Sequence, residues 1–306
     1  MIETTPPGAD AATPRGASAF DARRFNVKPV SWWGLVGRDL LHNRSTMIGA
    51  AVLLIMVALS IAAPWIAPRN PNTINVVDRL LHPSREHLLG TDQFGRDLLS
   101  RVLYGGRLTL SVGAVSVGIG AILGTLLGML AGYYGRITDL VIMRLIDLLL
   151  AFPGILLALG IVAVLGTGMT NIMIAVGISS IPAYTRVVRG SVLSAREHLY
   201  VEAARVIGCR EPRILVRHLL PNILAPVIVL SSLGTAIAIL YAAALSFLGL
   251  GVQPPTAEWG AMLSGGRDWL SVAWWITTFP GIAIMLAVIC INVIGDGLRD
   301  ALDPRL

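Results

Sequence analysis

Hydrophobic residues along this chain gather in long uncharged runs, separated by polar segments that are rich in arginine. A helix needs roughly 20 apolar residues to cross a bilayer. Five runs reach that length, at residues 45–68, 108–135, 148–185, 219–257 and 270–295. The run 148–185 is too long for one helix and contains Gly166 and Gly168, so we expect two helices there, the first beginning near Leu140. The pattern predicts an all-α, polytopic membrane protein with about six transmembrane helices.

The composition supports a membrane location. Hydrophobic residues make up 55% of the 306 positions and charged residues only 14%, with a mean hydropathy of +0.72. A soluble domain of this length carries about 25% charged residues. The basic residues lie at the ends of apolar runs and do not form the clustered patch that a phosphate backbone requires, so we expect membrane lipid as a partner and no nucleic acid.

The distribution of basic residues predicts the orientation. With the N-terminus in the cytoplasm, 17 of the 24 Lys and Arg residues lie inside and 7 outside. Both termini and the segment 191–222 are then cytoplasmic, residues 69–107 form a periplasmic loop, and residues 108–306 hold five further spans. The helix after the segment 191–222 is expected at about 225–248.

The first 44 residues precede the first span, which we place at 45–68. Residues 1–30 lack an apolar core and predict a disordered cytoplasmic tail. Residues 31–44 place Trp32, Trp33 and Leu40 on one helical face, as in a helix lying in the membrane interface. A tryptophan belt at the head of the first span remains an alternative.

Glycines recur every fourth residue in the second span, at Gly120, Gly124, Gly128 and Gly132. Such a stripe lets a second helix approach the backbone closely inside a membrane. We favour static close packing over a sliding contact.

Several kinds of chemistry are missing from the sequence. Lys28 is the only lysine and does not belong to a phosphate-binding loop, so ATP must be bound by another polypeptide. The histidines and the two cysteines lack metal-site spacing, and we expect no cofactor, no metal and no enzymatic activity.

The span centres carry no charge, which argues against ion coupling. Arg144 and Asp147 are expected to form a pair within one helix.

The segment 191–222 has the pattern of two short helices with a glycine corner. The first helix is expected to end where Gly208 adopts a left-handed conformation. Pro212 suits the first turn of the second helix, which Pro221 ends or joins to the next span. Ala203 and Ala204 keep one face small, so that another protein's groove could close around it.

Glu202, Ala203 and Ala204, followed by Gly208 and then Leu220 and Pro221, resemble the EAA motif of permeases from binding-protein-dependent ABC importers. His218 replaces the usual isoleucine, a substitution similar to that of the peptide-importer branch. Four more segments resemble the dipeptide, oligopeptide and nickel permeases, in particular their C-type subunit: 87–97 (HLLGTDQFGRD), 246–251 (SFLGLG), 253–260 (QPPTAEWG) and 295–304 (GDGLRDALDP). The run 151–158 (AFPGILLA) resembles the glutathione and dipeptide importers.

The resemblance implies a type I ABC importer fold in a bacterial inner membrane, with the segment 191–222 seated on an ATPase. It also implies a homologous second permease, two ATP-binding subunits and a substrate-binding protein outside. The outer segments 90–107 and 254–267 are candidates for docking that protein. Small peptides are the expected substrate. Nickel chelates or oligosaccharides, a non-transporting scaffold for an ATPase, and an ion-coupled carrier remain alternatives.

Overall fold

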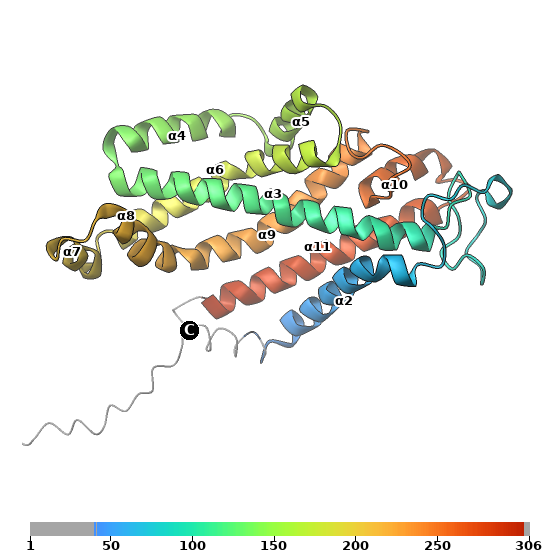
Figure 1. Ribbon diagram of the computed structural model, residues 1–306, viewed down its shortest axis with the longest axis horizontal. Coiled ribbons are helices and arrows are strands. Elements are labelled where there is room, and N and C mark those ends of the chain that lie inside the picture. The colour runs from blue at the N-terminus through green and yellow to red at the C-terminus, as the bar shows by residue number, and fades with distance from the viewer. Residues whose placement is uncertain (1–39, 41, 303–306) are drawn as a thin grey trace, which may run out of the picture.

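The computed structural model describes residues 40 and 42–302, and within these residues every regular element is a helix (Figure 1). The interfacial helix expected at 31–44 lies almost wholly outside the described residues, and the tail 1–30 lies entirely outside them. The elements are α2 (Arg44–Ile66), η2 (Val76–Asp78), α3 (Leu98–Tyr134), α4 (Arg136–Leu150), α5 (Gly154–Leu165), α6 (Met169–Ala195), α7 (Leu199–Val206), α8 (Glu211–Ile214), the π-helical turn η3 (Leu215–Leu219), α9 (Leu220–Phe247), α10 (Trp259–Gly266), η4 (Arg267–Trp269) and α11 (Trp275–Leu302).

Five helices are long and apolar enough to cross a membrane, and the count is six if α4 and α5 are taken as one bent span. The all-α, polytopic class is therefore confirmed. Large apolar side chains on α2, such as Leu54 and Ile55, are exposed. In a membrane they face lipid, which needs no polar cover.

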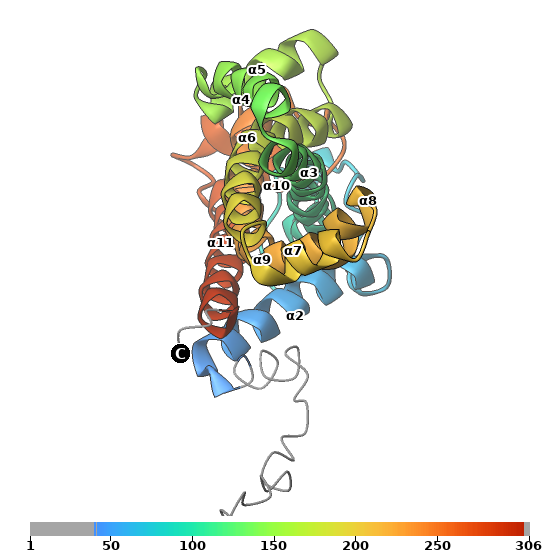
Figure 2. The same ribbon diagram turned by 90° about the vertical axis from the view of Figure 1, so that its left-hand side faces the viewer.

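The long helices pack roughly side by side (Figures 1 and 2). α3 packs along α6, and α9 lies against α3, α6 and α11, while α2 packs on α11 and α3. The start of α2 and the end of α11 lie toward the same end of the bundle as α7 and α8 (Figure 1). The loop after α2 and the helix α10 lie at the opposite end, which we call the outer end.

The second span begins earlier than predicted. α3 starts at Leu98 and not at Leu108, so the outer loop expected at 69–107 ends before its predicted limit. Asp97 caps the helix by accepting hydrogen bonds from the backbone N–H (2.9 Å) and hydroxyl (2.7 Å) of Ser100. Arg101 is buried, donates hydrogen bonds to the carbonyls of Pro71 and Pro255, and lies 3.5 Å from the Asp92 carboxylate. Treating arginine as a boundary marker therefore gave the wrong start.

The third span is not one straight helix. α4 and α5 meet at an angle of 90° around Ala151, Phe152 and Pro153. Proline lacks the N–H that would continue the helix and disfavours helical backbone at the residue before it. The break expected at Gly166 and Gly168 is present, with φ values of +91° and +132°.

The helices after the segment 191–222 also differ from the prediction. The helix that starts at Glu211 continues through the turn η3 into α9, so the second short helix is not separate from the span expected at 225–248. The last span, expected at 270–295, is α11 and runs from Trp275 to Leu302.

The predicted pairing of Arg144 with Asp147 is wrong. Asp147 accepts a hydrogen bond from Arg186 of α6 (2.8 Å). Asp139 lies nearer the start of α4, and it accepts two hydrogen bonds from Arg189 of α6, at 2.5 and 2.6 Å. Both ion pairs join α4 to α6, so the charges hold two helices together.

Candidate functional site

The helix α7 carries the alanine pair and ends in a glycine corner. Gly208 has the expected left-handed backbone (φ +77°). Its N–H donates to the carbonyl of Arg205 (2.9 Å), and the N–H of Cys209 donates to that of Ala204 (3.0 Å). These two bonds define a Schellman motif, which turns the chain sharply after the helix.

The surface of α7 is more apolar than expected for a helix outside the bundle. Leu199, Val206 and Ile207 are 81%, 82% and 77% exposed. Ala203 is exposed with them, but Ala204 is only 4% exposed and packs in the chain's own core. The expectation that both alanines face a partner is therefore wrong for Ala204. Exposed apolar side chains in such a cluster indicate a protein-binding surface.

The second half of the segment is a continuous helix with one widened turn. The N–H of Leu220 donates to the carbonyl of Leu215, five residues back. Pro221 explains this turn, because it cannot donate an N–H and its ring crowds the carbonyl four residues before it. Leu219 is fully buried, whereas His218 lies at the surface side of the same turn, with Nδ1 3.5 Å from the carbonyl of Arg213.

A hydrogen bond joins the two halves of the segment. The Asn222 amide donates to the Tyr200 hydroxyl (3.2 Å) and to the His218 carbonyl (2.6 Å). The Tyr200 ring stacks on His198 with centroids 5.9 Å apart. His198, Tyr200 and Asn222 line a polar recess between α6 and α9 together with Ser191 and Ser194. The sequence pattern gave no signal for this pairing, because the partners lie on different helices.

Two contacts connect the segment to α3. The Arg205 guanidinium lies over the Tyr133 ring, 5.4 Å from its centroid. Arg196, just after α6, donates to the carbonyl of Gly132 (2.9 Å). The corner, α3 and α6 are thus directly linked at this end of the bundle.

The glycine stripe faces α6 along its whole length. Gly120, Gly124, Gly128 and Gly132 are all buried. A Cβ on Gly128 would lie 2.7 Å from the Thr185 carbonyl oxygen, and one on Gly132 would lie 2.9 Å from Val192 Cβ. A Cβ on Gly120 would lie even closer to Ser180 Oγ, and one on Gly124 would lie even closer to Tyr184 Cβ. The stripe therefore brings α3 into backbone contact with α6.

At the outer end, segments far apart in the sequence come together. The Trp259 indole donates to the Val102 carbonyl (2.8 Å), and the Trp275 indole donates to that of Thr91 (3.1 Å). Glu258 is fully buried, caps α10 and accepts a hydrogen bond from Thr109 (2.9 Å). The two outer segments proposed from the sequence therefore form one packed structure.

Within residues 42–302, no three His, Cys, Asp or Glu side chains are grouped so that they could hold a metal ion. A comparison with family models identifies the family of this helical bundle. Residues 124–306 match the model of the binding-protein-dependent transport system inner membrane component, and residues 31–83 match the N-terminal TM domain of oligopeptide transport permease C. The chain belongs to this permease family. It is a multi-pass permease of the bacterial inner membrane that contributes to the translocation pathway of an ABC importer.

Relatives of this permease extend over most of the chain. A putative peptide transport system permease protein of Brucella abortus is 49% identical over 89% of this chain and 92% of its own length. The dipeptide transport system permease protein DppC of Alkalihalophilus pseudofirmus is 47% identical over 90% of this chain and 91% of its own length. The glutathione transport system permease protein GsiD of Escherichia coli O6:K15:H31 is 46% identical over 90% of this chain and 91% of its own length.

A solved structure shows the same fold. The inward-facing MetNI methionine ABC transporter superposes with a TM-score of 0.54 at 18% identity, over 67% of this chain and 98% of the other chain. The likeness concerns the architecture of the permease.

Proposed function

We propose that this permease is the C-type subunit of an importer for small peptides, of the dipeptide, oligopeptide or glutathione type. The observation that carries the proposal is the high identity, 46–49% over about nine tenths of the chain, to permeases whose names state peptide, dipeptide and glutathione transport. The match of the N-terminal residues to permease C supports the subunit type.

The partners in this proposal are a homologous second permease, two ATP-binding subunits and a substrate-binding protein. ATP hydrolysis takes place on the ATP-binding subunits, because the chain has no lysine that could serve a phosphate-binding loop. The proposed orientation has both termini in the cytoplasm, and the segment 191–222 then faces the ATPases.

In the proposed mechanism, α7 and its corner sit in a cleft of an ATP-binding subunit. The exposed Leu199, Val206 and Ile207 supply the apolar contact, with Glu202 and Ala203 on the same exposed surface. Closure of the ATPases then moves α7, and the contacts of Arg205 and Arg196 carry that movement to α3 and α6. ATP shifts the population of pathway states because the ATPases contact those states differently.

Uptake into proteoliposomes that contain the whole complex and its binding protein tests the proposal. We expect ATP-dependent uptake of a labelled dipeptide that unlabelled peptides compete with and that ionophores leave unchanged. Competition by a nickel chelate or an oligosaccharide in place of peptides would contradict the substrate class. Uptake without ATP that an ionophore abolishes would indicate an ion-coupled carrier. ATPase stimulation without any uptake would indicate a scaffold.

A further inference from the structure

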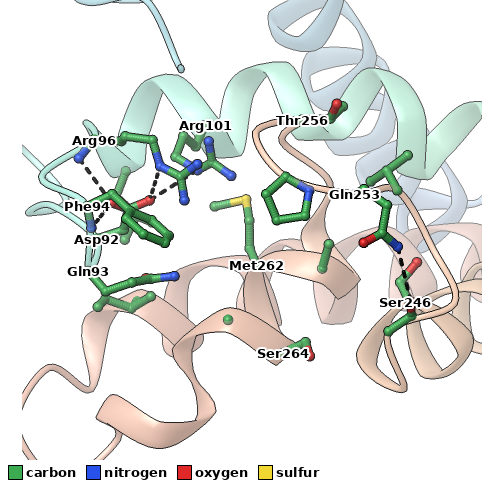
Figure 3. A pocket seen from close by; sticks show the side chains of 17 residues that line it. Asp92, Gln93, Phe94, Arg96, Arg101, Ser246, Gln253, Thr256, Met262 and Ser264 are labelled. Atoms are coloured by element: carbon green, nitrogen blue, oxygen red, sulfur yellow. Dashed lines mark hydrogen bonds and ion pairs between the residues drawn. The ribbon is translucent and has the colours of Figure 1, made fainter. Parts of the chain in front are cut away.

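A pocket at the outer end carries an excess of positive charge. It has a volume of about 180 Å³ and lies between the loop that precedes α3 and the segment from the end of α9 to α10 (Figure 3). Its charged lining residues are Asp92, Arg96 and Arg101, which are each 5% exposed or less. Two guanidinium groups thus share one carboxylate, as Figure 3 shows.

Among the residues that the structure describes, Asp92 is the one carboxylate that lines the pocket with the two arginines. Its Oδ1 accepts the backbone N–H groups of Phe94 (2.8 Å) and Arg96 (3.0 Å). Its Oδ2 accepts the Arg96 Nε at 2.6 Å and lies 3.5 Å from the Arg101 Nε. The terminal nitrogens of Arg96 make no hydrogen bond to another residue between positions 42 and 302. With two guanidinium groups and one carboxylate, the pocket has a net positive charge that favours an anion.

Three other acidic side chains of the outer end, Asp78, Asp97 and Glu258, are engaged elsewhere. Asp97 binds His87 (2.9 Å) and caps α3, and Asp78 lies near Arg69 and His87. Glu258 is committed to Thr109 and to the N-terminus of α10. None of these side chains lines the pocket.

Two further observations point to a ligand from a protein. The Ser246 hydroxyl also lines the pocket, is 2% exposed and has no hydrogen-bond partner within the described part of the chain. An apolar patch borders the same loop: Ile74, Val76 and Val77 are 57%, 70% and 88% exposed, and the carbonyl of Asn75, between them, lies directly against Gly95. An apolar patch beside a buried charged pocket is typical of a protein interface.

We propose that this pocket receives an acidic side chain of the substrate-binding protein when that protein docks on the outer end. The carboxylate pairs with Arg96 and Arg101, and the apolar patch contacts the surface around it. The volume of about 180 Å³ suits one side chain rather than a whole peptide. The inference rests on the proposed function, since it requires a binding protein.

Gln93 offers a sharp test because it lines the pocket, is partly exposed and makes no side-chain hydrogen bond within residues 42–302. Gln93→Glu adds a competing carboxylate at constant size, and Gln93→Leu removes the amide without adding charge. Asn72→Asp is the matched control, since it makes the same chemical change on the exposed outer loop outside the pocket. The measurement is the Kd of the peptide-loaded binding protein for the complete importer in nanodiscs.

We expect Gln93→Glu to raise the Kd about tenfold, Gln93→Leu to raise it less than Gln93→Glu does, and Asn72→Asp to stay within twofold of wild type. One acid-to-amide substitution in the binding protein should give the same loss and be non-additive with Gln93→Glu. Equal effects of Gln93→Glu and Asn72→Asp, or no effect of Gln93→Glu, would overturn the inference. So would an unchanged Kd together with a raised KM for peptide, because the carboxylate would then belong to the substrate.

The two proposals fail in different ways. If the wild-type complex takes up peptide while Gln93→Glu docks normally, only the carboxylate pocket is wrong. If the wild-type complex takes up no peptide but its docking is sensitive to Gln93→Glu, only the peptide assignment is wrong.

Discussion

At the residue scale, two ion pairs of the same type are held differently between α4 and α6. Asp139 accepts two hydrogen bonds from Arg189, and these side chains are 23% and 31% exposed. Asp147 accepts one from Arg186, and this pair is 49% and 53% exposed. Because solvent screens exposed charges, the first pair should contribute more to stability.

This difference gives a prediction for two isosteric substitutions. Asp139→Asn should lower the free energy of unfolding by roughly 1–3 kcal/mol, since it weakens a paired and hydrogen-bonded charge. Asp147→Asn should lower it by less than about 1 kcal/mol. Thermal unfolding of the purified chain in one detergent measures both, and an equal shift in Tm would contradict the assignment.

At the element scale, the contact of α3 with α6 depends on the absence of side chains at four positions. Gly128→Val would place a Cβ 2.7 Å from the Thr185 carbonyl oxygen. We expect overpacking to destabilise the protein by about 1–3 kcal/mol.

Gly118→Val is the matched control for that substitution. It lies on the same helix, and a Cβ there meets nothing within 4 Å. Both changes alter helix propensity equally, so only Gly128→Val should lower Tm and the yield of assembled complex. Similar losses of Tm and yield in both variants would show that helix propensity, and not the packing of α3 on α6, causes the destabilisation.

The helices themselves were largely predictable from the sequence, whereas their ends were not. Apolar runs located the spans because a bilayer demands about 20 such residues. The early start of α3 was missed because the apolar run was ended at Arg107, whereas the helix extends through Arg107 and Arg101 back to Leu98. The Arg101 guanidinium donates to the carbonyls of Pro71 and Pro255, which only the folded chain brings to it. The glycine stripe was visible as a pattern, but its partner helix was not.

At the scale of the whole molecule, we propose that the bundle has two functional ends. One end carries the exposed apolar α7 and its corner at Gly208, which the sequence located through its glycine, proline and alanine pattern. The other end carries the charged pocket, which the sequence did not reveal because Asp92 and Arg101 meet residues about 150 positions away around Pro255. The α3–α6 pair runs between the two ends (Figure 1).

The proposed coupling through α7 gives Gly208 a specific task in the transport cycle. A non-glycine residue with left-handed backbone costs roughly 1–2 kcal/mol, and asparagine tolerates that conformation better than valine does. The space around Gly208 is open, with no atom within 4 Å of a Cβ placed there. Gly208→Val therefore strains the corner without a steric clash, and Gly208→Asn is the matched control.

The most direct test of coupling through α7 is the number of peptides taken up per ATP hydrolysed in proteoliposomes that contain the complete importer. We predict that Gly208→Val lowers this ratio at least about fivefold while ATP hydrolysis continues, and that Gly208→Asn stays near wild type. An unchanged ratio for Gly208→Val would contradict coupling through the corner at Gly208.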